Sequence, residues 1–140
     1  MSRILALDFG TKRIGIALSD PTMSLASPHP FLDATPFKDF VDKIKTIVRA
    51  KEVIMILIGI PRNMDGSYGP SSEKALDFSR RLQDLLIVPI KTIDERLSTV
   101  EAQRRLQEAG KNQKQQRSVI DSSSAVVILQ SYLDSPPSFR

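Results

Sequence analysis

The chain has 140 residues, 41% of them hydrophobic, with a formal net charge of +4 and no cysteine. This length and apolar share fit one globular domain and argue against a disordered chain, and the lack of cysteine excludes disulfides and thiolate metal sites. No run approaches the roughly 20 apolar residues of a membrane span, and the N-terminus lacks a signal-peptide core. We therefore expect a cytoplasmic protein with no membrane association, a single domain over residues 1–134, and a flexible tail over residues 135–140.

The excess positive charge is confined to one segment, residues 96–117. This segment has six basic and two acidic residues, whereas the rest of the chain has 14 of each. It is either a solvated helix face with a polar loop or a surface that contacts phosphate groups. Because the segment offers no aromatic platform for unpaired bases, the second interpretation favours recognition of backbone and shape over reading of bases.

The first predicted elements are two short strands, over residues 4–7 and 14–18, joined by a tight polar turn. This pattern is typical of a β-hairpin, and we expect Gly10 to allow a positive φ in the turn. Asp8 ends the first apolar run, where a carboxylate is costly unless something pairs with it. The residues alone leave open whether Asp8 caps the turn or binds a metal ion.

Residues 25–32 predict a third strand. It contains Pro28 and Pro30, which confine it to an edge of the sheet. His29, the only histidine in the chain, lies between these prolines and is expected to be exposed. A single histidine leaves no histidine cluster for a metal ion, and a Ser-His-Asp triad would depend on this one residue.

The rest of the chain alternates helices and strands. Thr35 is the predicted N-cap of an amphipathic helix, with Pro36 in its first turn. The later predicted elements are a buried central strand over 52–58, a helix that opens at 69–71, a strand over 86–93, a helix over 98–109, a basic connector over 111–117 and a largely buried helix over 118–133. This order predicts an α/β fold with a five-stranded mixed sheet, an antiparallel meander followed by parallel strands, with helices packed on it.

Three carboxylates occupy positions that suit a metal site. Asp8 ends the first strand, Glu95 follows the last strand, and Asp121 lies in the first turn of the predicted final helix. Strand ends of one sheet can lie side by side, and hard divalent ions such as Mg²⁺ prefer oxygen ligands. Two such ions can activate a water and stabilise the leaving oxygen of a phosphodiester. Spacing alone leaves two alternatives open: Asp121 as a favourable acid near a helix N-terminus, and Glu95 as a surface residue.

Four motifs, in order along almost the whole chain, give it a resemblance to the YqgF (RuvX) family. They are Leu7-Asp8-Phe9-Gly10-Thr11-Lys12-Arg13-Ile14-Gly15, Gly59-Ile60-Pro61-Arg62-Asn63-Met64-Asp65-Gly66-Ser67, Asp94-Glu95-Arg96-Leu97-Ser98-Thr99, and Ile120-Asp121 followed by Ile128-Leu129-Gln130-Ser131-Tyr132-Leu133. One departure is Ser122-Ser123-Ser124, where the family pattern has glutamine and small apolar residues. The serines put local packing or substrate contacts in doubt more than metal binding.

The resemblance implies a ribonuclease H-like fold and a nuclease site. It implies that Asp8, Glu95 and Asp121 are the catalytic set and hold Mg²⁺ or Mn²⁺. It also places a loop with Asp65 beside that site and a basic residue after the glutamate. The residues expected to bind nucleic acid are Lys12, Arg13, Arg62, Asn63, Arg96, Lys111, Lys114 and Arg117.

The function implied by the resemblance is maturation of the 5′ end of precursor 16S ribosomal RNA, with the small ribosomal subunit as an expected partner. Three alternatives stay open: a Holliday junction resolvase acting on branched DNA, a non-catalytic factor that binds ribosomal RNA, and a phosphotransferase. A resolvase is expected to be a two-fold dimer, whereas an RNA-processing nuclease can be a monomer or a homodimer. The phosphotransferase is suggested because residues 8–11 also resemble the first phosphate-binding loop of the actin and sugar-kinase superfamily. That superfamily uses two such domains, which argues against it here.

Overall fold

The computed structural model describes residues 2–10, 12–60, 69–94 and 113–134, with the backbone alone at 71, 94 and 113–123. The elements are β1 (Arg3–Asp8), β2 (Arg13–Ser19), β3 (Ala26–Asp33), α1 (Phe37–Ala50), β4 (Val53–Ile60), α2 (Pro70–Leu85), β5 (Ile90–Asp94) and α4 (Gln113–Asp134). Among the described helices, none is long and apolar enough to cross a membrane.

The strands form one five-stranded sheet in the order β3-β2-β1-β4-β5. The pairs β1/β2 and β2/β3 are antiparallel, whereas β1/β4 and β4/β5 are parallel. This confirms the predicted mixed sheet and its meander. It also confirms that β3, with its two prolines, lies at an edge of the sheet. An edge strand tolerates proline because it has a neighbouring strand on one side only and needs fewer backbone N–H donors.

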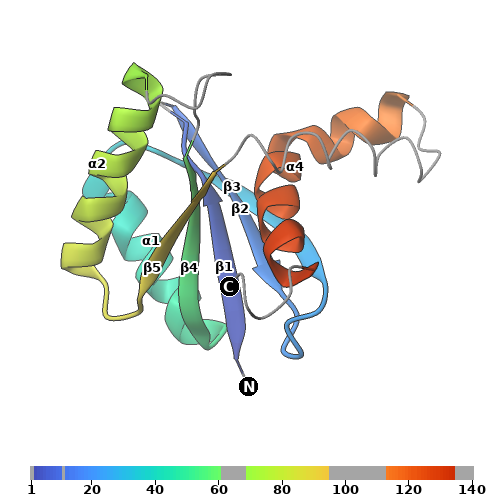
Figure 1. The fold of residues 1–140 in the computed structure, drawn as a ribbon, viewed down its shortest axis with the longest axis horizontal. Coiled ribbons are helices and arrows are strands. Elements are labelled where there is room, and N and C mark those ends of the chain that lie inside the picture. Colours follow the sequence, from blue (N-terminus) through green and yellow to red (C-terminus); the bar gives the residue numbers. More distant parts are fainter. Residues whose placement is uncertain (1, 11, 61–68, 95–112, 135–140) are drawn as a thin grey trace.

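Helices cover both faces of the sheet. Figure 1 shows α1 and α2 on one side of the strands and α4 on the other. The alternation along β1 explains this arrangement, since successive side chains of a strand point to opposite faces. Leu5 and Leu7 belong to the core under α1 and α2, whereas Ile4 and Ala6 belong to the core under α4.

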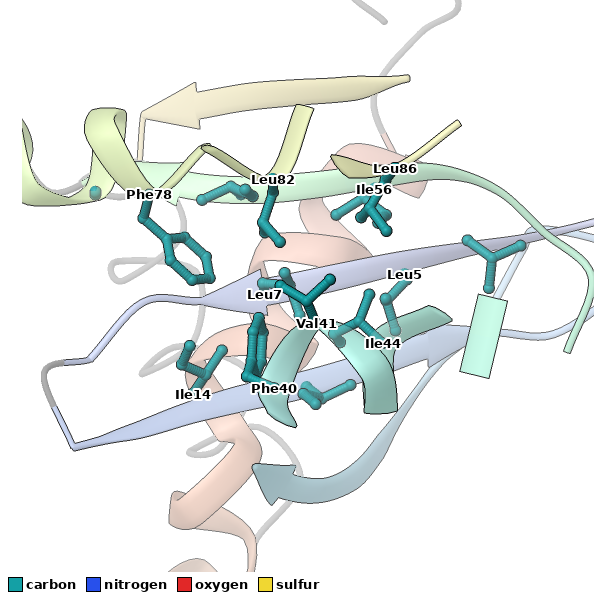
Figure 2. Close-up of a cluster of buried hydrophobic side chains, with 14 of the residues drawn as sticks. Leu5, Leu7, Ile14, Phe40, Val41, Ile44, Ile56, Phe78, Leu82 and Leu86 are labelled. Carbon is teal, nitrogen blue, oxygen red and sulfur yellow. The ribbon is translucent and has the colours of Figure 1, made fainter. Parts of the chain in front are cut away.

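The core under α1 and α2 is built from large aliphatic and aromatic side chains. Figure 2 shows Phe40 and Ile44 of α1 and Phe78 and Leu82 of α2 directed at the strands. Its buried members are Leu5, Leu7, Ile14, Ile16, Phe40, Val41, Ile44, Val53, Ile56, Ile58, Ile60, Ala75, Phe78, Leu82 and Leu86. Apolar residues at i, i+3, i+4 and i+7 give α1 the single buried face that was predicted.

Among the described residues, the core under α4 is smaller and contains three alanines. Its buried members are Ile4, Ala6, Ala17, Leu57, Ala125, Ile128, Leu129 and Leu133. The small side chains of the strands let the helix lie close to the sheet. The predicted burial of the final helix is confirmed over its second half.

Three predicted boundaries were wrong. The N-cap of α1 is Pro36 and not Thr35, and no side chain caps this helix. The strand predicted over 86–93 is β5, which begins only at Ile90, after a connection that includes the fully exposed Ile87. The final helix begins at Gln113, five residues before the prediction. Residues 113–117 are therefore helical and not part of a connector, since glutamine, lysine and arginine all favour helix.

His29 is half-buried in β3, where we expected it to be exposed. Its Nδ1 donates a hydrogen bond of 2.9 Å to the carbonyl oxygen of Pro30. The predicted helix over 98–109, the tail over 135–140 and residues 61–67 of the loop predicted over 59–67 lie outside the described residues. Gly59 and Ile60 are not part of that loop, because they end β4.

Candidate active site at the carboxyl edge of the sheet

The carboxyl ends of three parallel strands meet at one edge of the sheet. Asp8, the last residue of β1, pairs with Gly59 of β4, and Ile60 at the end of β4 pairs with Asp94 at the end of β5. Glu95 is the next residue of the chain after Asp94. Open sheets bind ligands in the crevice outside these carboxyl ends, so this edge is the natural place for a site.

Asp8 has glycine on both neighbouring strands. Its cross-strand partners are Gly15 in β2 and Gly59 in β4. Directly opposed residues project their side chains to the same face, so neither neighbouring strand places a side chain beside the Asp8 carboxylate. The alternation along β1 puts Asp8 on the same face as Ile4 and Ala6, the face covered by α4.

The Asp8 carboxylate is half-buried. Among the described side chains and backbone groups, we find no hydrogen bond or ion pair to it. A carboxylate that is partly removed from water and lacks a partner is costly, and a hard divalent cation takes carboxylate oxygens as ligands. The donor chemistry of Asp8, with glycine directly opposite it on both neighbouring strands, therefore fits Mg²⁺ or Mn²⁺.

Asp121 lies well inside α4. The helix begins at Gln113, so Asp121 is about two turns from its start, at 3.6 residues per turn. The alternative interpretation as an acid near a helix N-terminus is therefore wrong, because the dipole effect falls off within the first turn. Position 121 is four residues before Ala125 and seven before Ile128, so it lies on the helix face that packs on the sheet.

The described side chains contain one of the three predicted metal ligands, Asp8. Glu95 lies outside the described residues, and Asp121 is described by its backbone alone. Among the side chains that are described, no group of three or more histidine, cysteine, aspartate or glutamate residues could hold a metal ion. The complete set of three carboxylates therefore stays a prediction.

The turn after Asp8 is fixed by a close backbone approach. A Cβ on Gly10 would lie 2.3 Å from the carbonyl oxygen of Arg13, and the φ of Gly10 is outside the left-handed region. The expected positive φ was therefore wrong: glycine is needed for space and not for its backbone freedom. The carbonyl oxygen of Lys12 accepts a 2.9 Å hydrogen bond from the Ala34 amide, which ties the turn to the end of β3.

Two predicted nucleic-acid contacts lie at this same edge. Lys12 and Arg13 are both exposed, and the Arg13 guanidinium carbon is 4.7 Å from the centre of the Phe31 ring. Arg13 is two residues from Gly15 along β2, so it projects to the same face as Asp8. This arrangement offers a positive charge on the Asp8 face, where a phosphate group would need one.

The other predicted contacts are only partly described. Lys114 and Arg117 lie on α4, three residues apart and so on one side of the helix. Arg62, Asn63, Asp65, Arg96 and Lys111 lie outside the described residues. The glycines beside Asp8 were missed by sequence reasoning: both belong to the motifs quoted above, but the strand register that brings them together cannot be read from the sequence.

Comparisons with known proteins agree with this fold. Residues 2–135 match the model of the family described as "RuvX: Holliday junction resolvase". A protein of Halothermothrix orenii named "Putative pre-16S rRNA nuclease" is 46% identical over 133 residues, which cover 94% of each chain.

Two solved structures share the fold at low identity. RuvC of T. thermophilus, in complex with a Holliday junction substrate, is 10% identical with a TM-score of 0.58, over 94% of this chain and 92% of that one. The fowlpox virus Holliday junction resolvase is 12% identical with a TM-score of 0.53, over 96% and 99% of the two chains. These structures support the ribonuclease H-like architecture predicted from the sequence.

Proposed function

Because this chain belongs to the RuvX family, we propose that it is a metal-dependent nuclease that matures the 5′ end of precursor 16S ribosomal RNA. It is a hydrolase that acts on phosphodiester bonds, as its relatives are named nucleases. The observation that carries the proposal is Asp8, a half-buried carboxylate at the carboxyl edge with glycine on both neighbouring strands and no described partner.

In this proposal Asp8, Glu95 and Asp121 together hold Mg²⁺ or Mn²⁺. A bound ion would activate a water molecule as the nucleophile and would polarise the phosphate. Glu95 directly follows the end of the strand two positions from β1, and position 121 lies on the sheet-packing face of α4. Asp8 lies on that same face of the sheet, so the strand ends and the helix can supply ligands from two sides.

The basic residues would position the nucleic acid. Arg13 on the Asp8 face and Lys12 in the turn would contact phosphates close to the cut. We assign further phosphate contacts to the remaining predicted residues, namely Arg62, Asn63, Arg96, Lys111, Lys114 and Arg117. Phosphate contacts fix the register of the strand but read no sequence.

The proposal also includes a domain over residues 1–134, a cytoplasmic location, since the precursor RNA is made there, and association with the small ribosomal subunit. The protein would act as a monomer or a homodimer. A homodimer is required only if two strands are cut symmetrically, as in a junction resolvase.

The test compares cleavage of two labelled substrates, a precursor 16S fragment and a four-way DNA junction. Each is incubated with the purified protein or with Asp8→Asn, with Mg²⁺ or Mn²⁺ and with a chelator. We expect discrete cuts in the RNA that fall at least about a hundredfold in Asp8→Asn, equivalent to about 3 kcal/mol of transition-state stabilisation. The urea unfolding midpoint of the variant should be no lower than that of the parent, because the substitution removes a half-buried charge that has no described partner.

Other outcomes contradict the proposal in different ways. Symmetric cuts in the junction and none in the RNA would favour the resolvase activity that the family description names. Retained cleavage in Asp8→Asn would remove Asp8 from the site. If the protein binds the RNA but cuts neither substrate, and adding small ribosomal subunits does not restore cleavage, the protein is a binding factor.

A further inference from the structure

A second candidate site lies on the opposite face of the sheet from Asp8, at the same edge. It is a cavity of about 270 Å³ between the start of α1 and the middle of α2. We call it the aromatic pocket and define it by six of its lining residues: Phe9, Phe37, Phe78, Lys74, Asp77 and Arg81. These residues come from three separate parts of the chain, so no single sequence motif contains the pocket.

The apolar part of the pocket is made of packed rings. The ring centres of Phe9 and Phe78 are 4.9 Å apart, and those of Phe37 and Phe78 are 6.0 Å apart with the planes at 76°. Phe78 is 5% exposed and forms the floor, and its ring is among the core side chains of Figure 2. Phe9 and Phe37 are only half-buried, so part of each ring stays available to a ligand.

The polar part of the pocket is its exposed rim. Lys74, Asp77 and Arg81 are spaced at i, i+3 and i+7 on α2 and are all exposed, so they share one side of the helix. The Arg81 guanidinium carbon lies 4.0 Å from the centre of the Phe37 ring. Two cations and one carboxylate give the rim a net positive charge, which suits an anionic group better than a neutral or cationic one.

The position of the pocket indicates what it binds. Phe9 follows Asp8 directly in the chain, and consecutive Cα atoms are about 3.8 Å apart. β1 therefore presents Asp8 on one face of the sheet and Phe9 on the other, at the same edge. A nucleic-acid strand with a phosphate at Asp8 would have its neighbouring nucleotides within reach of the pocket.

We propose that the aromatic pocket holds one unpaired nucleotide of the nucleic-acid substrate. On binding, the base takes the place that the Arg81 guanidinium holds over the Phe37 ring and lies against Phe9, and Arg81 and Lys74 contact a phosphate. Stacking on aromatic rings is how proteins bind unpaired bases, and a guanidinium plane can stack on a base as well. The volume lies just below the roughly 300 Å³ at which sites for small molecules begin, which suits one base. This inference rests on the proposed nuclease function and adds that its substrate is single-stranded near the cut.

The test measures binding without cleavage, in the full-length Asp8→Asn protein. Anisotropy of a labelled single-stranded RNA and of a fully paired RNA duplex is compared for this protein and for the same protein with Phe37→Leu. Leucine keeps the apolar contact but removes the ring. We expect affinity for the single strand to fall at least about fivefold and affinity for the duplex to stay within about twofold.

A matched pair of surface variants, Arg81→Ala and Arg80→Ala, tests the proposal even if the Phe37→Leu protein unfolds. Arg81 lies in the pocket, whereas the adjacent Arg80 is exposed on α2 outside it. Arg81→Ala should reduce the slope of log affinity against log salt for the single strand by about 0.7, the value for one phosphate contact. Arg80→Ala should leave that slope unchanged.

Equal losses for single strand and duplex in Phe37→Leu, or no loss in either, would overturn the inference. So would identical salt slopes for the Arg81 and Arg80 variants; the pocket would then be free for an apolar side chain of a protein partner. These outcomes do not depend on cleavage, so they can be told apart from failure of the nuclease proposal, which the Asp8 experiment decides.

Discussion

The α1/α2 face and the α4 face of the sheet are both buried, but by different kinds of side chain. Among the described residues, the core under α1 and α2 has 15 buried members, which include Phe40, Ile44 and Phe78, whereas the core under α4 has eight and includes three alanines. The two proposed catalytic positions that the structure describes, Asp8 and Asp121, both lie on the α4 face. Among the described residues, the α1/α2 face therefore contributes more buried apolar side chains, whereas the α4 face carries the proposed catalytic positions.

Each face also has a glutamine that bonds to strand backbone. On the α1/α2 face, the side-chain oxygen of Gln83 in α2 accepts a 3.0 Å hydrogen bond from the Ile90 amide of β5. The second half of α4 adds polar contacts: Gln130 accepts a 2.9 Å hydrogen bond from the Ala26 amide and donates one of 3.1 Å to the Ser24 carbonyl. These bonds link α4 to the connection between β2 and β3. This connection lies at the end of the sheet opposite to the carboxyl ends of β1, β4 and β5 (Figure 1).

The largest expected effect comes from the same truncation made on each face. Ile44 in α1 and Ile128 in α4 are both fully buried. Ile44→Ala should reduce the free energy of unfolding by about 4 kcal/mol, because large neighbours hold the cavity open, and Ile128→Ala by about 2–3 kcal/mol, because α4 can settle onto the sheet. Urea unfolding measures both values.

The same pair should affect cleavage in the opposite order. Shifting α4 moves position 121 relative to Asp8, so Ile128→Ala should lower the cleavage rate of the folded protein more than Ile44→Ala does. Rates are compared at a temperature at which both variants are fully folded. If Ile44→Ala lowers the rate as much, stability and chemistry are not divided between the two faces.

A smaller effect is expected from the polar contacts of α4. Gln130→Ala removes the hydrogen bonds to both the Ala26 amide and the Ser24 carbonyl and should cost about 1–2 kcal/mol, at about 0.5–1.5 kcal/mol for each bond. Hydrogen exchange at the Ala26 amide gives a local readout, and exchange there should become faster while the amides of α1 keep their protection. Unchanged exchange at Ala26 would mean that the apolar core alone holds α4.

The sequence predicted the architecture well because local patterns determine it. The short apolar runs of β1 and β2, the prolines of β3 and the single apolar face of α1 each follow from short-range sequence. The errors have non-local causes. β5 begins at Ile90 because pairing with Ile56 of β4 decides which residues of an apolar run join the sheet. Gly10 is needed because the carbonyl of Arg13 approaches it.

The candidate site was predictable only in part. Asp8 was identified because a carboxylate at the end of a buried strand is unusual, and its membership of a metal-binding set came from the resemblance. The glycines on both sides of Asp8 depend on strand register, and the aromatic pocket depends on packing between Phe9, Phe37 and Phe78. Both features join residues that are distant in sequence, and single-sequence patterns do not show such contacts.

The smallest expected effect is a pH dependence of stability that comes from the connection between β2 and β3, to which Gln130 of α4 is hydrogen-bonded. Asp20 receives hydrogen bonds from the Thr22 hydroxyl and from the Leu25 and Ser24 amides, and these hold the pKa of its carboxyl well below its usual value. A lowered pKa in the folded state means that the ionised group stabilises the fold at pH above its ordinary pKa of about 3.9, and that this contribution is lost as the pH falls through the folded-state value.

Asp20→Asn keeps an acceptor for the two amides but cannot ionise. We therefore expect the variant to have a lower urea midpoint than the parent at pH 7, and the difference to shrink as the pH is lowered from 5 to 2. Ser24 and Ala26 lie in and next to this connection, so the loss should also appear as faster exchange at the Ala26 amide and leave α1 unaffected. A constant difference between the two proteins over that pH range would show that the Asp20 charge contributes nothing to holding the connection, and Gln130 would then carry the polar attachment of α4 alone.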